Sequence, residues 1–306
     1  MKKTAILATA VATALMAGAA AAESSVYGNI RLNVQSQDQL AMESGKLIVG
    51  FKGSEDLGNG MAAIYHIEME HDRADNETAG QTWSNDLSFV GLKGDFGQVT
   101  LGVQDDAAGF ACGATDIFIS YTGEVCGAAA SNGPLDNAIV YANTFGDLTF
   151  VGGITLDGDL TATSPSIASD GSNPAPGNHT VVALNYAAGD LQLGFQLTSP
   201  DSDLNIDDWM VVGGSYTMDQ FTFGFTLADD GNETGTELAV AVGLGGGTVK
   251  VGLSQGEDII GEDIVNVQYD YNLSKKVYTG VQYSSVDKAV GSDPDDLIQA
   301  WLGMKF

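Results

Sequence analysis

Apolar and polar residues alternate with a period of two in sixteen separate segments of about eight to ten residues. In segment 190–198, leucine and phenylalanine occupy one face while glutamine, glycine and threonine occupy the other, and segments 220–228 and 264–271 repeat this arrangement. A β-strand places successive side chains on opposite faces, whereas an α-helix repeats about every 3.6 residues. The pattern therefore predicts sixteen strands, of which the other thirteen begin near Val26, Lys46, Met61, Asp86, Gln98, Asn137, Asp147, Val181, Trp209, Glu237, Thr248, Val277 and Asp296.

The connections between these segments alternate in length. Short turns such as 55–59 and 95–97 alternate with longer, polar and acidic connections such as 36–44 and 104–136. This alternation is typical of an antiparallel meander in which one rim of the sheet is kept minimal and the other is elaborated.

A sheet of sixteen strands needs a way to protect its edges. An open meander of this size would exceed the usual limit for an open sheet and would leave two edges exposed. A soluble barrel of sixteen strands would enclose a lumen too wide for side chains to fill. We therefore expect an all-β fold, a transmembrane 16-stranded antiparallel β-barrel whose apolar faces point outward into lipid and whose polar faces line water.

The charge balance excludes one large class of partners. The chain has 40 acidic residues against 12 Lys and Arg, a formal net charge of −28. Nucleic-acid binding needs clustered basic side chains, so a nucleic-acid partner is not expected. Hydrophobic residues make up 44% of the chain, which is too many for a disordered acidic tail.

The N-terminus has the pattern of a secretory signal peptide. Residues 1–3 are short and basic, residues 4–18 are apolar, and Ala20–Ala22 offers a small-residue cleavage site. We expect residues 1–22 to be the signal peptide and residues 23–306 to be the exported barrel. No stretch after Gly18 reaches the roughly 18 to 20 continuous apolar residues of a membrane-spanning helix.

The last segment alternates up to a terminal aromatic residue. Ile298 and Leu302 share one face with Ala300 and Met304, and the chain ends on Phe306. A terminal aromatic at the end of an alternating strand resembles the C-terminal assembly signal of bacterial outer-membrane barrels. The resemblance implies the barrel-assembly machinery as a partner.

Three local segments and the final residue carry a wider resemblance. The segments are 25–31 (SVYGNIR), 87–102 (LSFVGLKGDFGQVTLG) and 137–141 (NAIVY), together with Phe306. With them the chain resembles the general diffusion porins of Gram-negative bacteria over essentially its whole mature length. The resemblance implies a homotrimer of sixteen-stranded barrels in the outer membrane, in contact with lipid and lipopolysaccharide. It also implies that the third external loop of each barrel folds into the lumen as a constriction.

Residues 104–136, called the third loop below, follow the fifth expected strand. We expect its carboxylates Asp105, Asp106, Asp116 and Glu124 to face the water path, although a solvated external loop would also explain them. Apolar residues of the loop are expected to cover the barrel interior, namely Phe110, Ile117, Phe118, Ile119 and Tyr121.

The only two cysteines of the chain, Cys112 and Cys126, lie in the third loop. The alternatives are a disulfide, a metal-binding pair or two free thiols. An isolated pair in an oxidising compartment favours a disulfide. Zinc would need further ligands, and the chain has only three histidines. A bridge here would restrict the tip of the loop and thus the aperture.

The wall opposite the third loop departs from the family pattern. Many general porins place a ladder of arginines there, but the matching inward positions of this chain hold Asp86 and Val140. By alternation, the other charged or titratable candidates that face inward are Arg31, Lys46, Lys52, His66, Glu68 and Glu70. Carboxylates that line a narrow lumen favour cations and repel anions, so we expect cation preference.

Catalytic motifs are absent from the sequence. It contains no H-E-x-x-H, no G-x-S-x-G and no glycine-rich phosphate loop before a helix, so an enzyme is not expected. No cofactor and no dedicated metal site are expected. Acidic pairs such as Asp229–Asp230 and Glu262–Asp263 would suit Ca²⁺, with solvated acidic loops as the alternative.

Three function classes fit these features. The first is a channel for passive diffusion of small hydrophilic solutes and ions. The second is a substrate-selective channel of similar fold with a binding site on the third loop. The third is a soluble acidic secreted β-protein, which would need an apolar core and would not tolerate a polar face on every strand.

Overall fold

The computed structural model describes residues 23–36, 40–71, 83–118, 125, 135–156, 178–200, 207–231, 234–255, 262–288 and 296–306. The expected signal peptide, residues 1–22, lies outside this part of the chain. The described residues contain no helix long and apolar enough to cross a membrane.

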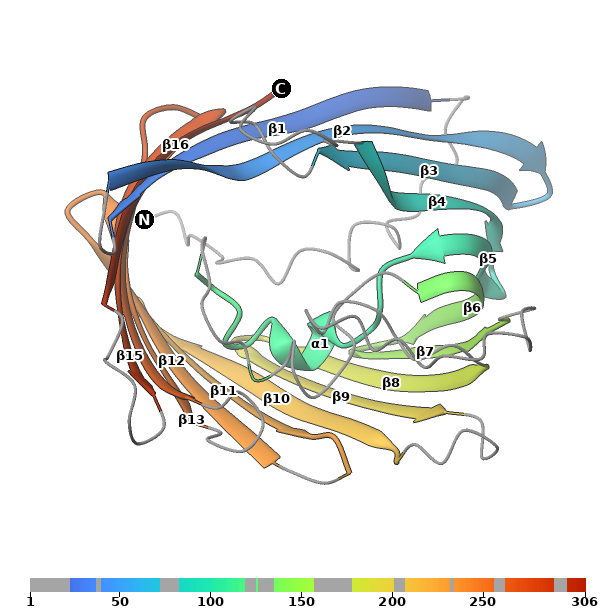
Figure 1. The fold of residues 1–306 in the computed structure, drawn as a ribbon. Coiled ribbons are helices and arrows are strands. Elements are labelled where there is room, and N and C mark those ends of the chain that lie inside the picture. The colour runs from blue at the N-terminus through green and yellow to red at the C-terminus, as the bar shows by residue number, and fades with distance from the viewer. Residues whose placement is uncertain are drawn as a thin grey trace, which may run out of the picture.

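Sixteen antiparallel strands form a ring in these residues, and Figure 1 shows the ring from one end. The strands are β1 (Glu23–Ser36), β2 (Leu40–Gly58), β3 (Met61–His71), β4 (Trp83–Gly94), β5 (Gly97–Gln104), β6 (Leu135–Phe145), β7 (Leu148–Thr155), β8 (His179–Ala188), β9 (Leu191–Pro200), β10 (Trp209–Met218), β11 (Phe221–Asp229), β12 (Thr234–Leu244), β13 (Gly247–Gln255), β14 (Glu262–Asn272), β15 (Val277–Lys288) and β16 (Leu297–Lys305). Each strand pairs with its neighbours in sequence order. The expected sixteen-stranded antiparallel barrel is confirmed.

The ring closes between its first and last strands. β1 pairs with β16 from Asn29 opposite Lys305 to Ser36 opposite Ile298. Gly28 and Phe306 then exchange two backbone hydrogen bonds, of 3.2 Å and 3.1 Å. No strand edge is therefore left open among the described residues.

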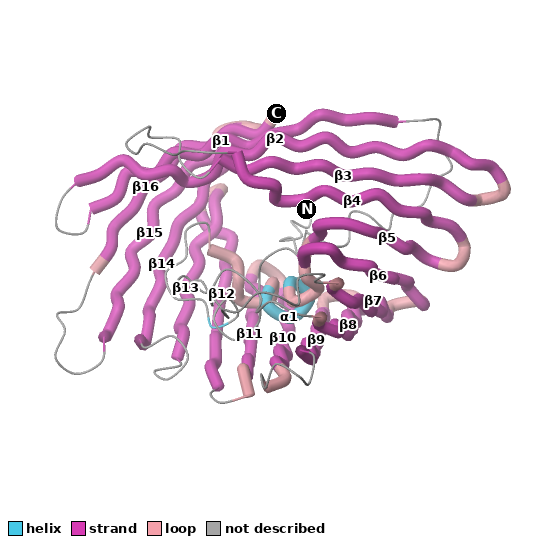
Figure 2. The backbone as a smooth tube through the Cα atoms, turned by 45° about the vertical axis from the view of Figure 1, so that its right-hand side comes forward, coloured by secondary structure: helices cyan, strands magenta, loops and turns pink. Residues whose placement is uncertain are grey.

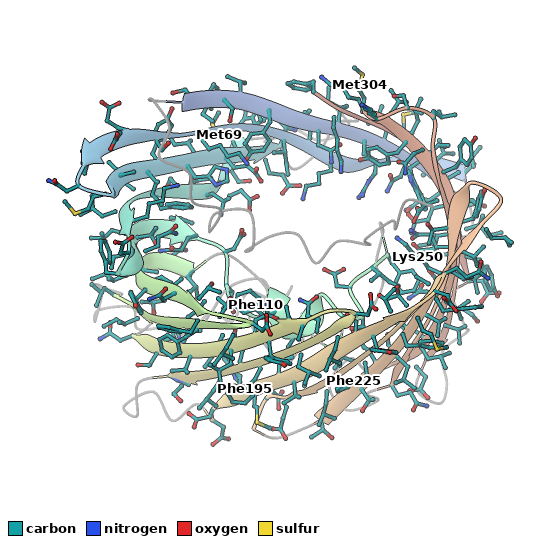
Figure 3. The ribbon with its side chains drawn as sticks, turned by 180° about the vertical axis from the view of Figure 1, so that it is seen from behind. Met69, Phe110, Phe195, Phe225, Lys250 and Met304 are labelled. Carbon is teal, nitrogen blue, oxygen red and sulfur yellow. The ribbon has the colours of Figure 1, made fainter. Side chains whose placement is uncertain are left out.

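The barrel has its apolar face outside and its polar face inside. Phe223 is 42% exposed on the outer face, whereas Gln196 and Thr226, on the inner face, are at most 1% exposed. Figure 3 shows the same division, with Met304 on the outer side of the ring and Lys250 on the inner side. This is the arrangement that a barrel in lipid requires, because apolar side chains meet the acyl chains and polar ones meet water.

The first hairpin differs from the expectation. β1 and β2 pair up to Ser36 opposite Leu40, so the long connection expected at 36–44 is largely strand. At the other end, β2 continues to Gly58, and only the two residues before Met61 form the turn. A register shift between Arg31 and Leu32 absorbs one extra residue in β2. The sequence did not predict this extension because both segments are polar like a loop, and the inner face of a barrel strand is polar as well.

The described part of the third loop contains the short helix α1 (Gly109–Cys112). Figures 1 and 2 both show α1 inside the ring of strands, next to β8, β9 and β10. Most residues of the loop after Phe118 lie outside the described part of the chain. The inward fold of the whole loop therefore stays a prediction.

Candidate pore lining

Strands β1 to β3 bring six of the expected pore residues to the inner face. Arg31 lies opposite Lys46 in the pairing of β1 with β2. Lys52 lies opposite His66, and the inward positions Gly50 and Ile48 lie opposite Glu68 and Glu70. Cross-strand partners share a face of the sheet, so these basic and acidic side chains line one stretch of wall.

Tyr27 joins these groups into a network. Its hydroxyl donates a hydrogen bond to the Glu68 carboxylate and is also in hydrogen-bond contact with His66 Nε2. The Lys52 ammonium lies 5.1 Å from the centre of the Tyr27 ring, within the range of a cation–π contact. Alternation also places Tyr27 on the inner face, but the alternating pattern does not single out an uncharged residue.

Asp86 lies at an irregularity in β4. The pairing of β3 with β4 shifts between Glu68 and Met69, which lie opposite Leu87 and Asn85, so Asp86 is the extra residue. Its carboxyl group is hydrogen-bonded to Glu68 and interacts electrostatically with Lys46 and His66. The bulge thus places this side chain on the same wall as Glu68, while a role of Asp86 in the pore constriction stays a prediction.

Asp105, directly after β5, is exposed but still partly surrounded by protein atoms, close to Asp86 and Lys46. Burial raises the pKa of the Asp105 carboxyl to about 6. The Asp86 carboxylate adds to this rise, and the Lys46 ammonium opposes it. These interactions connect the start of the third loop with the wall formed by β2 and β4.

Asp106 is 7% exposed and does not face the water path, contrary to the expectation. It accepts a hydrogen bond of 2.9 Å from Gln196 Nε2 and one of 3.4 Å from the backbone N–H of Ala108. Burial raises the pKa of the Asp106 carboxyl to about 6, while the hydrogen bonds from Gln196 and from the backbone at Ala107 and Ala108 lower it. Asp106 fastens the loop to β9 instead of lining the aperture.

The remaining loop candidates divide between the described and undescribed residues. Asp116 is exposed inside the ring, while Phe110 and Phe118 are buried as expected. Glu124, like Ile119 and Tyr121, lies outside the described residues. Cys112 is buried and disulfide-bonded, whereas Cys126 lies outside the described residues, so the pairing of the two stays a prediction.

A second group of charges lies on β12 to β14, and the sequence did not single it out. Lys250 forms a salt bridge of 2.6 Å with Asp270 and also donates a hydrogen bond to the carbonyl oxygen of Ile117 in the third loop. Glu237 is 2% exposed and accepts a 2.6 Å hydrogen bond from the Thr115 hydroxyl. Alternation would place all three wall residues inward, but their contacts with the loop depend on how the loop runs.

The described residues contain no group of three or more His, Cys, Asp or Glu side chains that could hold a metal ion. The charged side chains on the inside of the described ring instead form two groups, one on β1 to β4 and one on β12 to β14, and the described part of the third loop contacts the second group. Such a geometry suits ion and solute passage through the ring.

Comparison with known proteins agrees with this geometry. The sequence profile of the family described as "Gram-negative porin" matches residues 8–289, which is most of the chain. The chain belongs to the Gram-negative porin family. The porin is accordingly a protein of the outer membrane.

Sequence relatives of the porin match over a shorter stretch. The major outer membrane protein P.IB of Neisseria meningitidis is 34% identical over 116 residues, which is 33% of each chain. A P.IB protein of Neisseria gonorrhoeae is 36% identical over 116 residues, 33% of the porin and 32% of the relative. The aligned part thus spans about a third of the length of these relatives.

Solved structures share the fold of the porin over nearly its whole length. The anion-selective porin from Comamonas acidovorans has a TM-score of 0.72 at 17% identity and covers 93% of this chain and 100% of its own. OmpF of Salmonella typhi, solved with daunomycin, has a TM-score of 0.72 at 15% identity, with coverages of 93% and 97%. The trimer form of OmpT from Vibrio cholerae has a TM-score of 0.65 at 13% identity, with coverages of 94% and 100%.

Proposed function

We propose that the porin is a channel for the passive diffusion of small hydrophilic solutes and ions across the outer membrane, with a preference for cations. The observation that carries the preference is the carboxyl cluster of Glu68, Asp86 and Asp105 on the wall beside the start of the third loop. Fixed charges in a lumen with low-dielectric walls act strongly on passing ions, and carboxylates favour cations. The third loop is proposed to form the constriction.

Basic residues of the same wall oppose this preference only in part. Arg31 donates a 2.7 Å hydrogen bond to the carbonyl oxygen of Gly45, which holds it against β2. Lys46 lies within electrostatic reach of both Asp86 and Asp105, so its charge is largely balanced. Lys52 lies over the Tyr27 ring. The exposed carboxylate of Asp116 adds to the acidic side.

The reversal potential in planar bilayers under a KCl gradient tests the preference directly. We expect a potential of the sign given by K⁺ permeating faster than Cl⁻ at neutral pH, and the opposite sign would contradict the proposal. A current that a particular solute blocks in a dose-dependent way would instead mark a substrate-selective channel.

Reversing the charge at Asp86 tests whether this residue contributes to the ion selectivity. Asp86→Arg should shift the permeability ratio toward anions, because it replaces a carboxylate of the cluster by a cation. Asp95→Arg makes the same charge change in the exposed turn between β4 and β5 and should leave the ratio near the wild-type value. Equal ratios in both variants would show that Asp86 does not act on the ion path.

We also propose a homotrimer in contact with outer-membrane lipid and lipopolysaccharide. The trimer form of the structurally similar OmpT supports the assembly by analogy of fold. Chemical cross-linking of the detergent-solubilised porin should give a species of three chains, and a cross-linked product that stays monomeric would contradict the assembly.

A further inference from the structure

A row of glycines crosses the inner wall beneath the described part of the third loop. Each of the five consecutive strands β9 to β13 contributes one glycine whose missing side chain leaves room for the loop. We call this row the glycine seat, and it consists of Gly194, Gly213, Gly224, Gly235 and Gly252.

Three of these glycines lie against the loop backbone. A Cβ atom at Gly194 would stand 2.1 Å from the carbonyl oxygen of Phe110, and one at Gly213 would stand 2.1 Å from that of Ala111. At Gly224 the distance to the carbonyl oxygen of Ala114 would be 1.9 Å. These distances are far shorter than any van der Waals contact, so a methyl group at any of the three positions would displace the loop or the wall.

The other two glycines receive side chains of the loop. A Cβ atom at Gly235 would stand 2.3 Å from Cγ1 of Val125, and one at Gly252 would stand 2.6 Å from Cε2 of Phe118. None of the five seat glycines has the left-handed backbone conformation that favours glycine, unlike Gly245 in the turn between β12 and β13. The reason for glycine at these positions is therefore space and not backbone geometry.

Polar groups of the same strands hold the loop on the seat. Thr115 contacts the Thr226 hydroxyl at 2.7 Å and donates a 2.6 Å hydrogen bond to Oε2 of Glu237. The other carboxyl oxygen of Glu237 accepts the backbone N–H of Val125 at 2.9 Å. A buried carboxylate is costly unless it is hydrogen-bonded, and here both of its oxygens bind the loop.

We propose that the glycine seat and Glu237 together set the position of the third loop, and through it the width of the pore, with Glu237 as the positioning residue. The effect on pore width rests on the proposed channel function. The seating itself does not, because it concerns only contacts between the loop and the wall.

Single-channel recording tests the effect on the aperture. Gly224→Ala puts a methyl group between β11 and the loop, so the loop should move into the lumen and conductance should fall. Glu237→Ala removes the acceptor for two loop segments, so the loop should become mobile and the open-channel current noisier. The control is Gly243→Ala on β12, where a Cβ atom meets nothing within 4 Å, and it should conduct like the wild type.

Limited proteolysis in detergent tests the seating without reference to conduction. The third loop of the folded wild type should resist cleavage by protease. In Glu237→Ala, the protease should cut faster within residues 104–136. The cleavage rate of Glu237→Gln, which keeps an acceptor oxygen, should lie between those of the wild type and Glu237→Ala. If Gly224→Ala fails to fold, the two Glu237 variants still test whether contacts with the wall hold the loop in place. Wild-type conductance, noise and cleavage in folded Glu237→Ala would overturn the proposal, whereas a wild-type barrel that does not conduct would overturn only the channel function.

Discussion

Asp105 and Asp106 are adjacent in sequence but have different surroundings. Asp105 is exposed near Lys46, whereas Asp106 is buried against Gln196. The sequence predicted one environment for both, because it shows that a carboxylate belongs to the third loop but not which way the chain turns after β5. Their contacts with β9 and β2 join residues that are distant in sequence, which local patterns do not predict.

The charge of Asp105 should make the selectivity depend on pH. Its carboxyl has a pKa of about 6, so its negative charge is present above pH 6 and is lost as the pH falls through 6. The ratio of K⁺ to Cl⁻ permeability should therefore decrease between pH 7.5 and pH 5. In Asp105→Asn the ratio should be lower at pH 7.5 and should change less over the same range. Reversal potentials at each pH measure this, and an equally steep decrease in the variant would assign the effect to other groups.

Lys250 should contribute to the stability of the wall through its salt bridge with Asp270. Its side chain is 11% exposed and that of Asp270 is 19% exposed. Lys250→Met would leave the Asp270 carboxylate and the carbonyl of Ile117 without their cation, at a cost of about 3 kcal/mol in the free energy of unfolding, the lower end for breaking a buried pair. Denaturant unfolding of the detergent-solubilised barrel measures the loss. The control Lys275→Met, in an exposed turn, should change little.

At the scale of elements, the strands were largely predictable and their ends were not. The period-two pattern identified all sixteen strands because every strand of this barrel faces lipid on one side and water on the other. The extension of β2 to Leu40 was missed because its polar residues resemble a loop. The four-residue helix α1 carries no periodic signal, and the contacts of residues around it with β9 to β11 hold it in place.

The predicted disulfide should stabilise the third loop. A bridge between Cys112 and Cys126 would close about fifteen residues, which corresponds to about 3 kcal/mol in the chain-entropy model. Replacing both cysteines by serine should lower the unfolding temperature of the barrel and speed cleavage of the loop by protease. If the conductance of this variant equals that of the wild type, the bridge acts on assembly and stability, and the glycine seat and Glu237 position the loop without it.

For the whole molecule, the outward apolar face and the closure of the ring followed from strand number and alternation. The distribution of charge inside the ring did not follow in full. Glu237 and Lys250 were visible only as alternating polar positions, and their role depends on the third loop lying over β9 to β13. The path of the loop across the wall depends on the space that the five glycines of the glycine seat leave free. The alternating pattern within a single strand does not predict this path.

Closure of the ring should depend on Phe306. This residue exchanges two backbone hydrogen bonds with Gly28, and a Cβ atom at Gly28 would stand 2.2 Å from its ring. Deletion of Phe306 should reduce the amount of folded barrel in the outer membrane, measured by the gel mobility shift between unheated and heated samples. Phe306→Ala keeps the two backbone hydrogen bonds with Gly28 but loses the aromatic ring. If this variant loses as much folded barrel as the deletion does, the aromatic ring itself acts as the assembly signal.

The pairing of β1 with β16 also has a consequence for how the protein reaches its membrane. These strands are the most distant pair in sequence among the described residues, and until they meet, each carries a row of unpaired N–H and C=O groups. Hydrocarbon offers no partner for such groups, so a half-finished ring has no stable place in the bilayer. Insertion and closure must then proceed together, and because bringing such distant segments together is slow, the barrel needs protection from aggregation for as long as its two edges remain apart.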